Sequence, residues 1–305
     1  MKTLINVFWV FGFCFFNIHA FAGASLFTSD GTQYHIQNLS NEVKEMAEAI
    51  EKDMKAGGRG ADNIIFYVHG RGKEPKKSLD EVIPNLEEEY SAKVIMFHWF
   101  PSYKGPAGYP NEEAKAAAPD LLNVLASFQK FKKDHPEKFS KIKSTLLVHS
   151  MGNIVFSRML ESYQLQSLEK NLFDTVILNS ADADAKDHDQ WVKKIDFSDN
   201  IYITVNKNDN ILGLSAKRQR EKRLGQKLET MFGKDILLAN NANYVDFSKI
   251  DVNHRYFLKG GQDGNPYLEK FYEAILNGNP VNLEHFNGAK AKAGNGNKIF
   301  VFENE

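Results

Sequence analysis

The sequence predicts an α/β fold, a mostly parallel central sheet with helices on both faces, in one domain over residues 23–305. The first observation is a series of short segments, such as 64–68 and 145–148, that are apolar along their whole length. Strands that are buried on both faces have this pattern and are typical of parallel sheets. The second observation is that stretches with helical spacing of apolar residues separate these segments. Strands that alternate with helices indicate a parallel sheet covered on both sides.

The expected elements follow one another along the chain. Residues 26–39 are short and alternating, which indicates one or two antiparallel edge strands, and 41–55 carries apolar residues at helical spacing. The parallel strands are expected at 64–68, 94–97, 145–148, 175–178, 201–205 and, more weakly, 244–247. The later helices are expected up to Leu86, over 112–133, over 151–164, near Trp191 and over 267–276.

The carboxy-terminal part is less regular. Residues 277–297 are rich in Gly, Asn, Ala and Lys, a composition that predicts a loose tail. Residues 299–302 are apolar and could return to the sheet as an edge strand.

Residues 1–22 have the pattern of a secretory signal peptide. Lys2 precedes an apolar run over 4–16, and small residues around Ala22 suit a cleavage site. The apolar run is shorter than the roughly 20 residues that a spanning helix needs, so we expect no stable membrane span after cleavage. The sequence therefore predicts an exported protein, periplasmic or secreted. The single cysteine, Cys14, lies inside this segment, which excludes cysteine as nucleophile or metal ligand in the mature protein.

Charge and motif content narrow the range of partners. The formal net charge is −1, so no overall field favours nucleic acid as a partner. The basic run 217–223 is interpreted as a solvated helix face. The histidines are scattered, and neither a His-Glu-x-x-His metal motif nor a phosphate-binding glycine loop is present. We therefore expect a small-molecule or lipid substrate and chemistry without a cofactor.

Ser150 is the clearest candidate for a catalytic residue. It lies in Val-His-Ser-Met-Gly, residues 148–152, directly after a predicted strand and before a predicted helix. Such a turn presents the serine hydroxyl beyond the carboxyl end of the sheet, where ligands of parallel α/β folds bind. Gly152 suits the close backbone approach that the turn requires. A helix N-cap serine is the alternative interpretation.

With these segments in place, the chain resembles the α/β-hydrolase superfamily and, within it, a bacterial group of uncharacterised, esterase- and lipase-like serine hydrolases. The resemblance covers about 64–257. The segments that carry it are Val-His-Gly at 68–70, Trp-Phe-Pro-Ser at 99–102, His-Ser-Met-Gly-Asn at 149–153, Asn-Asp at 208–209 and His-Arg-Tyr-Phe at 254–257. The sequence departs from the pattern at Val148, where glycine or alanine is usual, and at Phe100, which interrupts Trp-Pro-Ser.

The superfamily arranges its nucleophile, acid and base in that chain order, which implies Ser150, Asp209 and His254 as a catalytic triad. Histidine would take the serine proton, and the carboxylate would orient the histidine and stabilise its charged form. His285 is the late alternative base. The alternative acids are Asp182 and Asp184, in a cluster that otherwise suits the start of a helix.

Two further groups of residues complete the expected site. The oxyanion formed during acyl transfer needs two N–H donors, and the positions that match are Met151, after the nucleophile, and Arg71, in the loop after the first parallel strand. An aromatic segment over 99–119 leaves the sheet on the same side and could line a substrate pocket or be an inert loop. Its candidate substrate-binding residues are Trp99, Phe100, Tyr103 and Tyr109.

The sequence thus predicts a serine hydrolase that cleaves a carboxylic ester, lipid ester or thioester through an acyl-enzyme on Ser150. An acyltransferase would use the same triad and replace water with an alcohol. A catalytically silent hydrolase fold that binds a ligand or partner is the alternative from another class.

Overall fold

The computed structural model describes residues 24–35, 44–46, 48–49, 52, 63–72, 75–100, 108–162, 168–262 and 264–303. The predicted signal peptide, residues 1–22, lies outside this part. So does much of the helix predicted over 41–55, although 44–46, 48–49 and 52 are helical. Within the described residues, no helix is both long and apolar enough to cross a bilayer.

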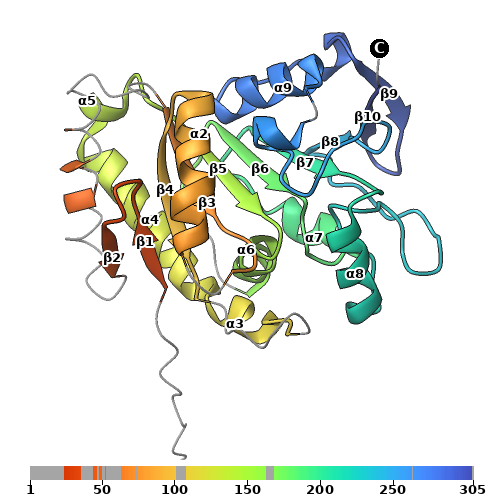
Figure 1. Ribbon diagram of the computed structural model, residues 1–305, viewed down its shortest axis with the longest axis horizontal. Helices are drawn as coiled ribbons and strands as arrows, with labels where there is room; N and C mark the ends of the chain where they lie inside the picture. Colours follow the sequence, from red (N-terminus) through yellow and green to blue (C-terminus); the bar gives the residue numbers. More distant parts are fainter. Residues whose placement is uncertain are drawn as a thin grey trace, which may run out of the picture.

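A single twisted sheet runs through the molecule (Figure 1). Among the described residues it has ten strands, in the order β2-β1-β4-β3-β5-β6-β7-β8-β10-β9. The seven strands from β4 to β10 in this order are parallel, whereas β1, β2 and β9 pair antiparallel. The strands are β1 (Ser25–Phe27), β2 (Gln33–His35), β3 (Asn63–Val68), β4 (Lys93–His98), β5 (Lys143–His149), β6 (Thr175–Asn179), β7 (Asn200–Val205), β8 (Asn243–Asp246), β9 (Ala289–Ala293) and β10 (Lys298–Phe302). The predicted fold class, a mostly parallel sheet with an antiparallel edge at 26–39, is confirmed.

Helices cover both faces of this sheet. On one face lie α3 (Asn111–Ala116), α4 (Ala118–Asp134), α6 (Gly152–Ser162) and α7 (His188–Val192). On the other face lie η2 (Ser78–Val82), α2 (Ile83–Tyr90) and α9 (Pro266–Leu276). In Figure 1, α2 lies in front of the sheet and α4 behind it. The short α5 (Pro136–Phe139) follows α4, and α8 (Asn210–Gln219) follows β7.

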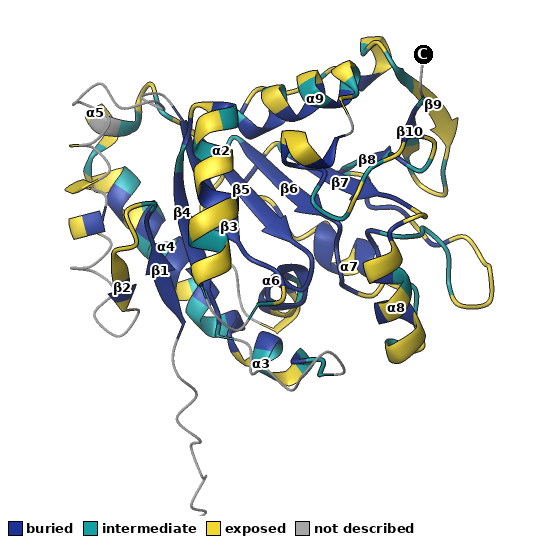
Figure 2. Ribbon diagram, in the orientation of Figure 1, coloured by how far each residue is buried: buried dark blue, intermediate teal, exposed yellow. Residues whose placement is uncertain are grey.

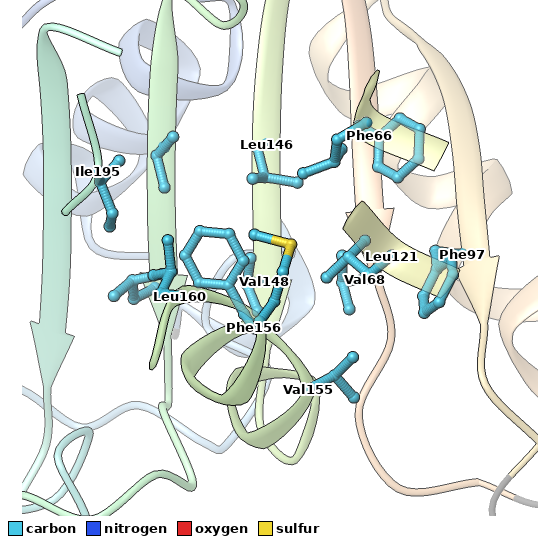
Figure 3. Packing of buried hydrophobic residues seen from close by; sticks show 14 of the residues in the cluster. Phe66, Val68, Phe97, Leu121, Leu146, Val148, Val155, Phe156, Leu160 and Ile195 are labelled. Carbon is cyan, nitrogen blue, oxygen red and sulfur yellow. The ribbon is translucent and has the colours of Figure 1, made fainter. Parts of the chain in front are cut away.

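Alternate side chains of the central parallel strands enter two separate cores. Phe66 and Val68 of β3 belong to the core under α4 and α6, and Ile65 and Tyr67 belong to the core under α2 and α9. This follows from the two-residue period of a strand, and it explains why the strands are apolar throughout. The central strands are dark blue, meaning buried, in Figure 2, whereas the edge strand β9 is largely exposed. Figure 3 shows strand side chains, including Val148, packed against Phe156 of α6.

The long helix predicted over 112–133 is two helices. α3 ends at Ala116, and α4 restarts at Ala118 with Pro119 in its first turn. Proline has no N–H to continue the hydrogen-bond ladder, and its ring obstructs the preceding turn, so a helix restarts there at low cost.

The loose tail predicted for 277–297 is wrong. This segment contains η5 (Leu283–His285), with Leu283 buried, and β9, which pairs antiparallel with β10. β10 itself lies parallel beside β8, so the returning strand is next to the edge rather than at it. The polar Ala-Lys composition of β9 concealed a strand, because the hydrogen bonds that hold it come from a partner beyond the segment.

Candidate active site

Ser150 lies in a tight turn between β5 and α6. Its φ is +53°, in the left-handed region, and its N–H donates to the carbonyl of Asn179 at 3.1 Å. A Cβ placed on Gly152 would lie 2.7 Å from the carbonyl oxygen of His69, and one placed on Gly70 would lie 2.7 Å from Cβ of Ser150. Backbone segments therefore meet so closely that only glycine fits at these two positions. This is the strand-to-helix turn expected from the sequence.

Val148 fits this turn without displacing it. Its side chain is fully buried in the core beneath α6 (Figure 3). Its carbonyl accepts a hydrogen bond from the side-chain amide of Asn153 at 3.0 Å. The branched side chain that departs from the superfamily pattern therefore points into the core, away from the hydroxyl of Ser150.

The structure brings Ser150, His254 and Asp209 together from three separate loops. Nε2 of His254 lies 3.0 Å from Oγ of Ser150, and its Nδ1 lies 2.7 Å from Oδ2 of Asp209. A carboxylate only accepts hydrogen bonds, so Nδ1 carries the proton and Nε2 accepts the serine hydroxyl. Ser150 follows β5, Asp209 follows β7 and His254 follows β8. These strands are parallel, so their carboxyl ends share one edge of the sheet.

The two oxygens of Asp209 have different partners. Oδ1 accepts the N–H groups of Ile211 and Leu212, each at 3.0 Å, and so caps the first turn of α8. Oδ2 accepts from His254. The carboxylate is thus held in place by the start of a helix, and its side chain is only 1% exposed.

Asp182 and Asp184, the alternative acids, face a different partner. Nε of Arg223 lies 2.9 Å from Oδ1 of Asp182, Asp184 pairs with Nη1 of the same guanidinium, and the hydroxyl of Ser215 donates to Asp182 at 2.6 Å. Burial raises the pKa of Asp182, against the lowering effect of Arg223. The interpretation of the acidic cluster as the start of a helix does not hold for Asp182 and Asp184, because α7 begins only at His188; it holds for Asp187, the N-cap residue, and for Asp189 in the first turn.

The interpretation of the basic run 217–223 as a solvated helix face is wrong at Arg223. Its side chain is buried against the two carboxylates, whereas Lys217, Arg218 and Arg220 are exposed. His285, the alternative base, is exposed in η5, between α9 and β9. The structure pairs Ser150 with His254 instead.

The main-chain carbonyl of His254 accepts two side-chain hydrogen bonds that the sequence analysis missed. Nε2 of His149 donates at 3.3 Å, and Oγ of Ser180 donates at 3.0 Å. Burial, and then the neighbouring His254, lower the pKa of His149 well below its ordinary value, so this ring is neutral. Ser180 follows β6 just as Ser150 follows the neighbouring β5, with φ at +44°. That equivalence of position was the signal available in the sequence.

His69 and Trp99 fasten the loop that carries Arg71. The indole N–H of Trp99 donates to the carbonyl of His69 at 3.0 Å, and the backbone N–H of Trp99 donates to Nε2 of His69 at 3.3 Å. The two rings stack with centroids 5.6 Å apart. Burial lowers the pKa of His69, as do the neighbouring His98 and His149, so the ring accepts as a neutral imidazole.

A cleft of about 870 Å³ opens over Ser150. Most of its lining side chains are polar, and they come from four parts of the chain, at 67–71, 78–89, 208–211 and 251–261, together with His149 and Ser150. Arg71 lines the cleft, and Met151 is buried behind the serine.

The aromatic residues expected to bind substrate lie elsewhere or outside the described residues. Trp99 is buried beneath the loop of Arg71, and Phe100 packs edge-on against His98. The hydroxyl of Tyr109 lies 3.0 Å from Oγ of Ser215, to which it donates because the proton of Ser215 goes to Asp182. Tyr103 lies outside the described residues. None of the three described aromatic residues is among those that line the cleft, so their contact with substrate stays a prediction.

Residues 42–262 match the profile of a family described as alpha/beta hydrolase of unknown function (DUF900). The chain belongs to this family. A comparison with curated proteins finds no match. Within the described residues of this α/β hydrolase, no group of three or more His, Cys, Asp or Glu side chains is arranged to hold a metal ion.

Solved structures similar to this α/β hydrolase include three esterases. An esterase of Pyrobaculum calidifontis has 12% identity and a TM-score of 0.36, with 72% of this chain and 77% of that chain covered. Carboxyl esterase 2 of Tuber melanosporum has 15% identity and a TM-score of 0.36, with 70% and 76% covered. A cold-adapted esterase from an Arctic intertidal metagenomic library has 11% identity and a TM-score of 0.39, with 72% and 84% covered.

Proposed function

We propose that this α/β hydrolase is a serine hydrolase that cleaves a carboxylic ester, lipid ester or thioester bond through an acyl-enzyme on Ser150. The observation that carries the proposal is the continuous hydrogen-bond series Asp209–His254–Ser150, with distances of 2.7 and 3.0 Å, beneath an open cleft. A serine hydroxyl becomes a useful nucleophile when an oriented histidine can take its proton.

Each step of the proposed reaction is assigned to one group. Nε2 of His254 takes the proton of Ser150 as Oγ attacks the ester carbonyl carbon, and the Asp209 carboxylate stabilises the imidazolium. The tetrahedral intermediate collapses, and the leaving alcohol or thiol takes the proton from His254. A water molecule then gives a proton to His254 and attacks the acyl carbon. The second tetrahedral intermediate collapses to the free acid, and Oγ of Ser150 leaves and takes the proton back from His254.

The oxyanion of the intermediate needs two preorganised donors, and we assign the backbone N–H groups of Met151 and Arg71 to this role. Met151 immediately precedes α6, where helix-terminal N–H groups gather. The loop of Arg71 passes within contact of Ser150, as the lack of space for a Cβ on Gly70 demonstrates. Trp99 holds that loop to the end of β4.

Fluorophosphonate labelling of the purified protein tests the proposal. We expect one covalent adduct that maps by peptide mass to Ser150 and is absent from Ser150→Ala. No adduct on folded protein would favour a catalytically silent ligand-binding fold. Addition of a short alcohol to the ester assay separates hydrolysis from acyl transfer, because an acyltransferase would form a new ester.

We also propose that the protein is exported after cleavage following Ala22, on the strength of the signal-peptide pattern in residues 1–22. The amino-terminal sequence of protein recovered from the periplasm or medium tests this. An intact amino-terminus on cell-associated protein would contradict it.

A further inference from the structure

The segment 211–237 carries every large apolar side chain that is exposed among the described residues. These side chains are Ile211, Leu214, Met231, Phe232 and Leu237. Phe232 is 90% exposed and Leu214 is 61% exposed. Single exposed apolar residues are ordinary on protein surfaces, but their concentration in one segment marks an interaction surface. The segment begins at the cleft, because Ile211 lines it.

Helix α8 presents one apolar face outward. Ile211 and Leu214 are three residues apart and so share a face, on which Arg218 follows one turn later. Leu212, buried, lies on the inner face. The first turn of this helix is fixed by the Asp209 cap, which ties the outward face to the position of the catalytic site.

Phe232 occupies the tip of a tight turn. The N–H of Thr230 donates to the carbonyl of Lys234 at 2.8 Å, and the N–H of Gly233 donates back to the carbonyl of Thr230 at 2.9 Å. Gly233 adopts a φ of +72° that glycine tolerates. A closed turn thus holds an aromatic ring out into solvent. In Figure 1, helix α8 and this cyan turn lie in the same right-hand part of the view, and Figure 2 shows both largely exposed.

The charges around these apolar residues are mostly positive. Between 207 and 237, the exposed charged residues are one acid, Asp235, and five bases, Lys207, Lys217, Arg218, Arg220 and Lys234. The whole chain has a formal net charge of −1, so this excess is local. Apolar side chains flanked by Lys and Arg are typical of surfaces that lie in the headgroup region of anionic bilayers.

We propose that the exposed face of segment 211–237 docks this protein on an anionic phospholipid bilayer. Phe232 and Leu214 enter the headgroup region, where they leave water, while the surrounding bases contact lipid phosphates. Ile211 then places one side of the cleft against the lipid. Docking goes beyond the proposed hydrolysis, since it needs neither the hydroxyl of Ser150 nor the base His254.

Vesicle co-sedimentation tests docking directly. Phosphatidylcholine vesicles are compared with vesicles of equal parts phosphatidylcholine and phosphatidylglycerol. We expect the protein to bind the anionic vesicles more tightly and to dissociate as salt is added. Phe232→Ser and Leu214→Ser should each weaken binding, and Lys217→Glu should weaken it at least fivefold, on the order expected for one basic residue near an anionic membrane.

Lys141→Glu is the matched control for charge. Lys141 is exposed just before β5, at the amino-terminal end of the strands and therefore at the opposite end of the sheet from the cleft. All samples share one amino-terminus, so the apolar run over 4–16 contributes equally to each. We expect Lys141→Glu and Ser150→Ala to bind like the unmodified protein, which keeps docking separate from catalysis.

Three outcomes would overturn docking. They are absence of binding to anionic vesicles, equal losses in Lys217→Glu and Lys141→Glu, and unchanged binding in both Phe232→Ser and Leu214→Ser. Light scattering of the same variants adds a further check. If Phe232→Ser converts a dimer to a monomer, the apolar surface is covered by a second copy of the chain and the bilayer assignment is wrong.

Discussion

The imidazole of His149 donates a hydrogen bond from Nε2 to the main-chain carbonyl of His254, at 3.3 Å. The two rings lie with centroids 4.9 Å apart. His149 is the neighbour of Ser150 in sequence, so the end of β5 both presents the nucleophile and holds the loop that presents the base. Ser180, at the end of β6, holds the same carbonyl from a second strand. The separation of Ser150 and His254 is therefore set by two parallel strands.

Replacement of His149 should lower turnover through the position of His254. We expect His149→Leu to reduce kcat about tenfold with little change in KM, the scale of one lost hydrogen bond and its effect on alignment. His149→Gln keeps a donor near the position of Nε2 and should recover part of the loss. Ester hydrolysis and thermal unfolding measure both. Equal kcat in the two variants, with only the Tm changed, would show that His149 serves stability alone.

Two substitutions of Ser180 separate the effect of its hydroxyl from the effect of backbone strain. Ser180→Ala and Ser180→Gly both remove the donor to His254, but only glycine relieves the φ of +44°. We expect a similar fall in kcat, about threefold to tenfold, in both variants, and a higher Tm for Ser180→Gly. If activity follows the Tm rather than the loss of the hydroxyl, the hydrogen bond to His254 has no part in catalysis.

Asp209 has two roles, as the cap of α8 and as the acceptor beside His254, and two substitutions separate them. Asparagine is a good N-cap residue, so Asp209→Asn should keep α8 and the Tm while kcat falls on the order of 10⁴-fold through loss of the carboxylate beside His254. Asp209→Ala should lose the same activity and also the cap of α8, and loss of the cap should lower the free energy of unfolding by about 1 kcal/mol. Steady-state kinetics and urea unfolding distinguish the two. A nearly active Asp209→Asn would refute the assignment of Asp209 as the acid.

The pair of Asp182 and Arg223 should govern stability rather than turnover. Removal of the guanidinium in Arg223→Met leaves a buried carboxylate without its partner, and we expect a loss of about 3–5 kcal/mol in the free energy of unfolding at neutral pH. Burial raises the folded-state pKa of Asp182 above 3.8. Protons are therefore bound more tightly in the folded state, and stability contributed by this group is present at low pH and lost as the pH rises.

The deficit of Arg223→Met relative to the unmodified protein should therefore grow as the pH rises above 3.8, because the opposing effect of Arg223 on the pKa is gone. Urea unfolding at several pH values measures this difference. In the Asp182→Asn background position 182 carries no carboxylate, so the stability lost when Arg223→Met is added to Asp182→Asn should vary less with pH than the loss in Arg223→Met alone. A constant deficit in Arg223→Met itself would contradict the assignment of the effect to Asp182.

Several elements were readable from local patterns because their causes are local. The uninterrupted apolar strands at 64–68 and 145–148 indicated burial on both faces, and two separate cores were found. The Val-His-Ser-Met-Gly segment indicated the turn at Ser150. Strand β9 was missed because its stability comes from pairing with β10 rather than from its own composition.

By itself, the sequence determined the fold class, the order of the strands from β3 to β8, and the turn that presents Ser150, because each depends on residues within one segment. The tertiary structure decided which carboxylate meets His254 and which donors hold its carbonyl. Asp182 and Asp209 both follow parallel strands and are equivalent in pattern. Arg223 pairs with Asp182, whereas an N–H group at the start of α8 holds Asp209 so that its other oxygen faces His254. Such partners are separated by many residues, and only the packing of the strands and loops brings them within hydrogen-bond distance.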